Sequence, residues 1–166
     1  MKKLLILSIA AILALSFAAC GAKPAETGAS VLDGSLESIL EEIYETADCS
    51  DNFKEFIKTG LQTTVVSEER NEYYLGKDDI EYEEALASEP IMMPSAYELT
   101  LVRVKEGADI EKIKEDIKAN VNPQKWVCVG VDPDKVIVDS IGDVIIIIMS
   151  NDEGKALHDA FLALKG

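Results

Sequence analysis

The sequence predicts an α+β domain in which helices pack against a mainly antiparallel sheet. Its segments follow the order helices, two strands, helix, two or three strands, helix, and the strands are joined by turns of the hairpin type. The run of residues 144–149 is apolar at every position. Such a run is typical of a strand covered on both faces, in the middle of a sheet.

Apolar residues spaced three or four apart predict the helices. The first helix follows Ser35, which is placed to cap it, and a second short helix ends at Gly60. Another short helix closes at Gly76. The clearest pattern begins with Asp109 as its cap and stops at Pro123, and a final helix closes the chain.

Runs rich in β-branched and aromatic residues between turn signals predict the strands. In the run that begins at Tyr97, the alternation of apolar and polar residues changes phase at Leu101 and Val102, which predicts a β-bulge there. The candidate strands are residues 61–66, 80–93, 97–105, 126–129, 135–138 and 144–149.

Residues 1–19 have the composition of a secretory signal peptide: two lysines, an apolar stretch, and small residues directly before Cys20. The stretch is shorter than the roughly 20 residues that cross a bilayer, so we favour a cleaved signal over a membrane-spanning helix. Residues 17–21 resemble the bacterial lipobox, with Phe17 in place of its usual leucine. This resemblance implies a diacylglyceryl group on Cys20; the alternative is an ordinary signal peptide that precedes a cysteine.

Residues 20–34 are predicted to be a flexible tether because they are rich in small and polar residues, and residues 35–166 are predicted to form one folded domain. A lipid on Cys20 would hold the protein on the outer face of the cytoplasmic membrane. The membrane, reached through that lipid, is therefore the first partner we expect.

The chain has 31 acidic against 16 basic residues, a formal net charge of −15 at pH 7. An acidic surface of this kind repels nucleic acid, which we exclude as a partner. Metal cations, basic peptides and neutral ligands remain compatible with the charge.

Two cysteines remain besides Cys20. An extracytoplasmic location permits a disulfide between Cys49 and Cys128, although nothing in the sequence shows that they meet. Cys49 lies in a polar turn, whereas Cys128 lies between two valines of a candidate strand. We therefore interpret Cys128 as a buried structural thiol.

Four segments of turns and strands carry a family resemblance: residues 91–105, 107–114, 122–126 and 141–144. They resemble a domain-of-unknown-function family of small lipoproteins from anaerobic, clostridial-type Gram-positive bacteria. The resemblance covers about residues 35–164. It implies a lipid-anchored extracytoplasmic domain and carries over no catalytic residue.

Catalytic motifs are missing from the sequence. His158 is the only histidine, and we expect it to be exposed on the last helix rather than paired. There is no nucleophile elbow, phosphate loop, Cys-x-x-Cys pair or His-Glu-x-x-His helix. One tryptophan in a small domain also argues against a glycosidase with paired carboxylates. We therefore expect no enzyme activity and no cofactor.

The densest group of acids is a candidate cation site. Its carboxylates would suit a hard cation such as calcium, but the spacing lacks a calcium-loop signature, and solvated charge at a sheet edge is the simpler interpretation. The candidate residues are Asp78, Asp79, Glu81 and Glu83.

A second group of residues is a candidate groove for a protein partner. Methionine adapts to different surfaces and aromatic side chains anchor partners, although the same residues would also fill a core. The candidate residues are Met92, Met93, Tyr97 and Trp126.

Together these observations favour a lipid-anchored, non-enzymatic module that binds an envelope protein. The alternative is a small-ligand or cation-binding lipoprotein that serves a transporter, and an envelope hydrolase comes third. A pocket of converging polar groups would favour the ligand, and an exposed apolar patch would favour the protein partner.

Overall fold

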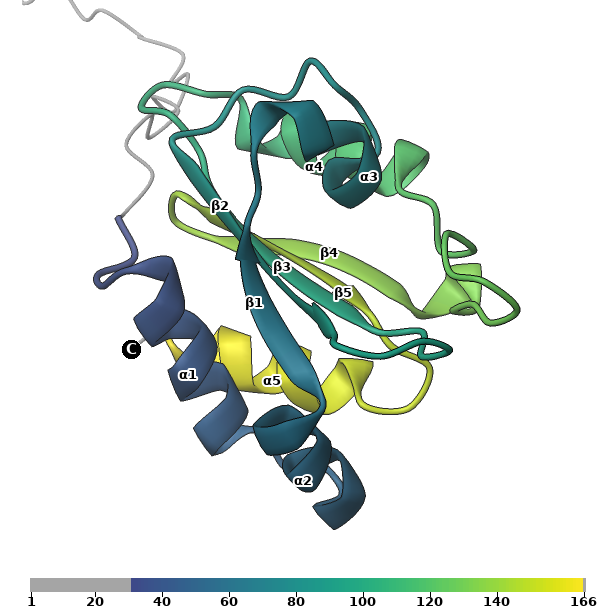
Figure 1. Cartoon of the computed structure of the whole chain (residues 1–166). Helices are drawn as coiled ribbons and strands as arrows, with labels where there is room; N and C mark the ends of the chain where they lie inside the picture. The colour runs from purple at the N-terminus through teal and green to yellow at the C-terminus, as the bar shows by residue number, and fades with distance from the viewer. Residues whose placement is uncertain (1–30, 166) are drawn as a thin grey trace, which may run out of the picture.

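Helices and strands form three layers in the computed structural model, which describes residues 31–165 (Figure 1). A five-stranded antiparallel sheet of order β1-β2-β3-β5-β4 lies between α1, α2 and α5 on one face and α3 and α4 on the other. The predicted fold class is confirmed. The elements are α1 (Leu36–Thr46), α2 (Asp51–Thr59), β1 (Leu61–Val65), η1 (Glu68–Arg70), α3 (Asn71–Leu75), β2 (Glu84–Pro90), β3 (Glu98–Arg103), α4 (Ile110–Asn120), η2 (Pro133–Lys135), β4 (Val136–Ile141), β5 (Val144–Met149) and α5 (Gly154–Ala163).

The signal peptide, Cys20 and most of the predicted tether lie outside the described residues. Within residues 31–165, none of the helices is both long and apolar enough to span a membrane.

The apolar core lies on both faces of the sheet. Every residue of β5 is buried, as the sequence predicts for a strand in the middle of a sheet. Ile146 and Ile148 pack on the side of α1 and α5, whereas Ile145 and Ile147 pack on the side of α3 and α4. Two helical layers therefore share one sheet, which holds both cores together.

Two predicted N-terminal helix caps are confirmed. The Ser35 side chain accepts a hydrogen bond from the Ser38 amide at 3.2 Å, and the Asp109 side chain accepts one from the Lys112 amide at 3.1 Å. Gly76 ends α3 at φ +82°, a conformation that disfavours side chains. The caps thus fix where α1, α3 and α4 begin or end.

The predicted strand at residues 126–129 is wrong. These residues belong to the irregular connection between α4 and η2, and Cys128 adopts φ +64°. Trp126 is nevertheless buried against Val131, Val136 and Met149. The segment is apolar because it packs onto the end of the sheet, not because it forms a strand.

The predicted bulge at Leu101 and Val102 is also wrong. Both residues keep an unbroken register with β2 and with β5. All of β3 is buried between the two helical layers, so its side chains need not alternate between apolar and polar. The strand predicted at residues 80–93 is shorter than expected, since β2 begins only at Glu84.

The two cysteines exchange the environments that the sequence predicts for them. Cys49 is buried, whereas Cys128 is exposed, and both thiols are free. Burial raises the pKa of Cys49 to about 12, and the carboxylate of Glu153 acts in the same direction. The interpretation of Cys128 as a buried thiol is therefore wrong.

The described chain begins at one end of the sheet, which we call the proximal end. Arg103, at the end of β3, donates hydrogen bonds there to the carbonyl oxygens of Leu32 (3.1 Å) and Gly34 (2.6 Å). It also pairs with Asp143 at 2.7 Å and Glu84 at 3.0 Å. The opposite end, where β2 finishes and β3 begins, is the distal end.

Candidate functional site

Exposed apolar side chains project from the loop between β2 and β3 at the distal end. They belong to three consecutive residues, Ile91, Met92 and Met93, of which Met92 is 75% exposed. Val127, 69% exposed, lies in the connection after α4. We call these four residues the distal apolar surface.

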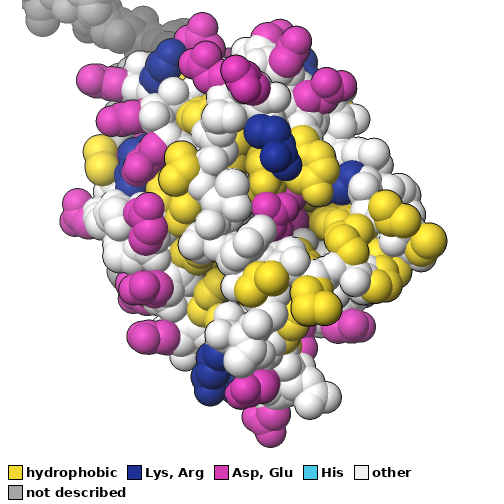
Figure 2. All heavy atoms as spheres, in the orientation of Figure 1, with side chains coloured by type: hydrophobic (Ala, Val, Ile, Leu, Met, Phe, Trp, Pro, Cys, Tyr) yellow, Lys and Arg dark blue, Asp and Glu magenta, His cyan; other side chains and the backbone are white. Residues whose placement is uncertain are grey.

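The two loops that carry this surface pack against the same apolar cluster. Ala96 from the β2–β3 loop and Val129 from the α4–η2 connection both contact the cluster around Trp126. Figure 2 shows apolar side chains gathered on the right of the molecule, where Figure 1 places these loops. Large apolar side chains exposed side by side are typical of surfaces that bind a partner.

A buried ion pair fixes one of these loops to the sheet. Lys125 donates hydrogen bonds to the Glu98 carboxylate and, at 2.8 Å, to the carbonyl oxygen of Tyr73. Thr100 donates to the other Glu98 oxygen at 3.1 Å. The side chains of Glu98 and Lys125 are 1% and 5% exposed, so the pair is almost fully removed from water.

Burial disfavours the charge on both members of this pair. It raises the pKa of Glu98 to about 7, although the Lys125 ammonium and the Thr100 hydroxyl act in the opposite direction. It also lowers the pKa of Lys125, against the attraction of Glu98. The pair thus positions the loop that carries Val127 at an electrostatic cost.

Aromatic rings surround the Lys125 ammonium. It lies 4.1 Å from the ring centroid of Tyr73 and 5.5 Å from that of Trp126, and Arg70 lies 4.8 Å from the Tyr73 ring. Cations attract the negative faces of such rings. These contacts join α3 to the loop after α4 beneath the distal apolar surface.

The four residues of the predicted groove separate into two groups. Met92 and Met93 are exposed, whereas Tyr97 and Trp126 are buried in different apolar clusters. The hydroxyls of Tyr97 and Tyr44 lie 2.9 Å apart, so Tyr97 is bound inside the domain. The prediction of one groove lined by all four is therefore wrong, although its two methionines lie on an exposed surface.

A shallow depression of about 600 Å³ lies at the same end of the sheet, between the starts of α2 and α5. The rings of Phe53 and Tyr97 pack edge to face, with their centroids 5.1 Å apart. Phe53 and Phe56 give the depression an apolar wall, and Ser50, Asn151 and Asp152 give it a polar one. The distal end therefore offers both protruding and recessed apolar groups.

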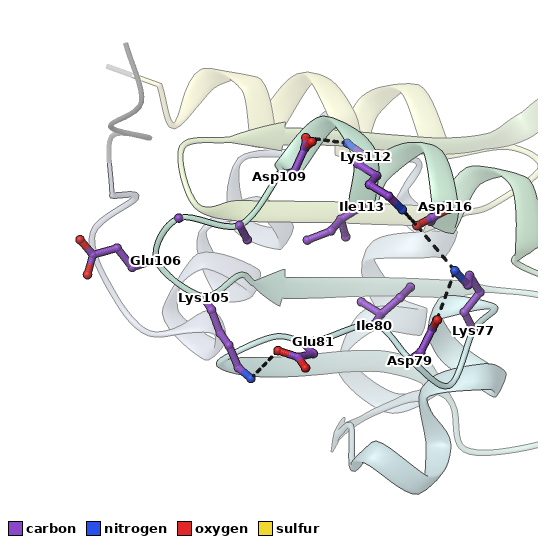
Figure 3. A pocket seen from close by; sticks show the side chains of 12 residues that line it. Lys77, Asp79, Ile80, Glu81, Lys105, Glu106, Asp109, Lys112, Ile113 and Asp116 are labelled. Carbon is purple, nitrogen blue, oxygen red and sulfur yellow. Dashed lines mark hydrogen bonds and ion pairs between the residues drawn. The ribbon is translucent and has the colours of Figure 1, made fainter. Parts of the chain in front are cut away.

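A second depression, of about 500 Å³, lies between the start of α4, the loop before it and residues 77–81 (Figure 3). Ile80 and Ile113 contribute apolar surface to it, and charged side chains of both signs line it. Lys77 pairs with Asp79 at 3.2 Å and with Asp116 at 3.6 Å. Two of the carboxylates that line it, Asp79 and Asp116, thus have a lysine partner.

The candidate cation site divides between this depression and solvent. Asp79 and Glu81 line the depression, where Lys105 pairs with Glu81 at 3.0 Å, whereas Asp78 and Glu83 do not line it. Among residues 31–165, no three histidine, cysteine, aspartate or glutamate side chains are grouped so that they could hold a metal ion. The structure does not bring the four carboxylates together.

His158 is paired, contrary to the prediction that it is exposed and alone. Its Nε2 lies 2.8 Å from the Asp139 carboxylate, and its side chain is 22% exposed. The pKa of Asp139 is lowered: burial raises it, but the hydrogen bonds from His158 and the Ser140 amide outweigh burial. Neither of the two depressions includes these side chains.

The fold and this site define an α+β domain with an exposed apolar surface at one end of its sheet. No protein-family model, curated protein or solved structure matches the chain. The resemblance to clostridial-type lipoproteins therefore stays a prediction from the sequence.

Proposed function

We propose that this protein is a lipid-anchored, extracytoplasmic module that binds a protein of the cell envelope through the distal apolar surface. The observation that carries the proposal is the exposure of Ile91, Met92, Met93 and Val127 on two loops that pack against the same apolar cluster. Methionine-rich apolar surfaces suit protein partners because the thioether side chain adapts to the shape it meets. The activity is binding, and no catalytic step is part of the proposal.

The orientation of the domain supports this proposal. The chain begins at the proximal end, where Arg103 binds the backbone of Leu32 and Gly34. The apolar surface lies at the other end of the sheet. An anchor upstream of residue 31 would therefore leave the binding surface facing away from its point of attachment.

Site-specific photo-cross-linking in intact cells tests the binding surface. A photoreactive amino acid replaces Met92 in one variant and the exposed Glu115 of α4 in a matched control. We expect a discrete adduct from position 92 that Val127→Asp removes, and none from position 115. Equal adducts from both positions would refute the surface.

The lipid anchor has a separate test. Cys20→Ser should release the protein from the membrane fraction, because two acyl chains on that residue hold it there. A variant that still sediments with membranes would contradict the lipid anchor. It would leave the proposal about the binding surface unaffected.

The depression in Figure 3 favours a second candidate function, a small-ligand or cation-binding lipoprotein that serves a transporter. Charges of both signs around Ile80 and Ile113 would suit a small zwitterion better than a bare cation. Adding calcium tests cation binding directly. A rise in Tm that Asp79→Asn abolishes would support a cation site. An unchanged Tm would exclude calcium.

A further inference from the structure

The outer edge of β1 is an unpaired strand edge. Ile91 donates its amide to the Gly60 carbonyl, and Val66 donates to that of Ala85, each at 2.9 Å. Bonded pairs alternate along an antiparallel ladder, so the backbone groups of Leu61, Thr63 and Val65 point away from β2. Within residues 31–165 no strand pairs with that side of β1.

This edge lacks the features that normally keep a strand edge single. Natural edges carry charges, prolines or bulges that discourage pairing with another chain. Residues 60–67 contain neither a charge nor a proline, in a chain in which 28% of residues are charged. Val65 is 72% exposed, an unusual position for a β-branched apolar side chain. The edge is thus suited to accept another strand.

The sequence of β1 is suited to pair with itself. A two-fold axis at Thr63 would place the two Thr63 residues opposite each other and Leu61 opposite Val65 of the second copy. All three outward backbone positions then form hydrogen bonds, and Val65 is covered by an apolar side chain. Facing threonines and facing apolar residues are favourable cross-strand pairs.

Charges beyond the two ends of β1 agree with an antiparallel arrangement. The antiparallel arrangement brings the end of α2 of one copy, which carries Lys58, toward the start of η1 of the second copy, which carries Glu68. Both side chains are exposed, and neither belongs to an ion pair among the described residues. The symmetry repeats this opposite-charge contact at each end of the interface.

We propose that the β1 edge is a dimerisation surface whose partner is a second copy of this chain. The two sheets join antiparallel through β1 into one continuous sheet. The formal charge of −15 on each chain opposes association. Salt screens charges beyond about 8 Å at physiological ionic strength, so the short-range strand pairing dominates there. The surface is separate from the distal apolar surface, and neither proposal depends on the other.

Native mass spectrometry of the full chain, extracted in a mild detergent, tests this dimer. Thr63→Glu places two like charges at the two-fold axis, and Thr63→Gln is its uncharged match. We expect dimers of the wild type and of Thr63→Gln, and a rise of about tenfold or more in the dissociation constant of Thr63→Glu. Because Thr63 is exposed in the single chain, both variants should keep the wild-type Tm at concentrations at which the wild type is monomeric.

A charge exchange tests the antiparallel arrangement. Lys58→Glu and Glu68→Lys should each weaken the dimer about two- to tenfold, and the double variant should recover the wild-type affinity. A wild-type protein that stays monomeric at a concentration of tens of micromolar overturns the proposal. This holds even if a different protein binds the β1 edge. A dimer that Thr63→Glu leaves intact overturns it as well.

Discussion

Replacing Lys125 by methionine would leave the Glu98 carboxylate without its cation inside the domain. The two side chains are 5% and 1% exposed, and methionine keeps the length of the lysine stem. Removing one partner of a buried ion pair costs about 3–5 kcal/mol of unfolding free energy. The cost depends on pH, because protonation of Glu98 removes the unpaired charge.

The sign of this dependence follows from the pKa of Glu98, which burial raises from 4.5 to about 7. The folded protein holds this proton more tightly than the unfolded chain does. Proton binding by Glu98 therefore stabilises the folded state fully below pH 4.5, and this stabilisation is lost as the pH rises toward 7. At 1.36 kcal/mol per pKa unit, the loss in the wild type is about 3 kcal/mol.

Lys125→Met removes the positive charge that lowers the pKa of Glu98. In this variant the unfolding free energy should therefore keep falling to a higher pH than in the wild type. We expect the variant to lie about 3–5 kcal/mol below the wild type at pH 8. At pH 5, where Glu98 is protonated, the difference should shrink to about 1 kcal/mol, the value of the lost hydrogen bond to Tyr73. Urea unfolding at both pH values gives the two differences.

The matched control is Lys125→Met with Glu98→Gln, which removes both charges and keeps the shape of the site. It should recover most of the stability at pH 8. A Lys125→Met deficit of equal size at pH 5 and pH 8, or a double variant no more stable than the single one, would refute the buried-charge reasoning.

Three further predictions concern the fold. A maleimide should label the exposed Cys128 quickly and the buried Cys49 only after unfolding, and equal rates would contradict their burial. Ile147→Ala should lower the unfolding free energy by about 2–5 kcal/mol, since the side chain is fully buried in the middle of the sheet; a loss below 1 kcal/mol would argue against that position. Gly76→Ala should also destabilise the domain, because φ is +82° and a Cβ would lie 2.4 Å from the Asn120 backbone; an unchanged Tm would contradict this crowding.

The sequence predicts the helices and the interior strand β5 well because local signals suffice for them. Ser35, Asp109 and Gly76 are placed at helix ends, and the apolar run of residues 144–149 has no other place in an antiparallel sheet than its interior. These features depend on residues that are neighbours along the chain. The α+β class follows from their order.

The wrong predictions concern residues whose contacts are distant in the sequence, because such contacts give no pattern among neighbouring residues. Trp126 and Val129 have strand-like composition, but they belong to a loop that packs onto the sheet end. Lys125 meets Glu98 across 27 positions, and no spacing rule connects a lysine in a loop with a glutamate in a strand. Likewise, Met92 and Tyr97 lie five positions apart, yet only the methionine reaches solvent.

The contacts of Arg103 also decide how the domain would bear a mechanical load. Its guanidinium binds the Leu32 and Gly34 carbonyls directly to β3, which lies between β2 and β5. A force applied to the chain ahead of residue 31 is therefore transmitted to an interior strand, before it can peel α1 from the surface.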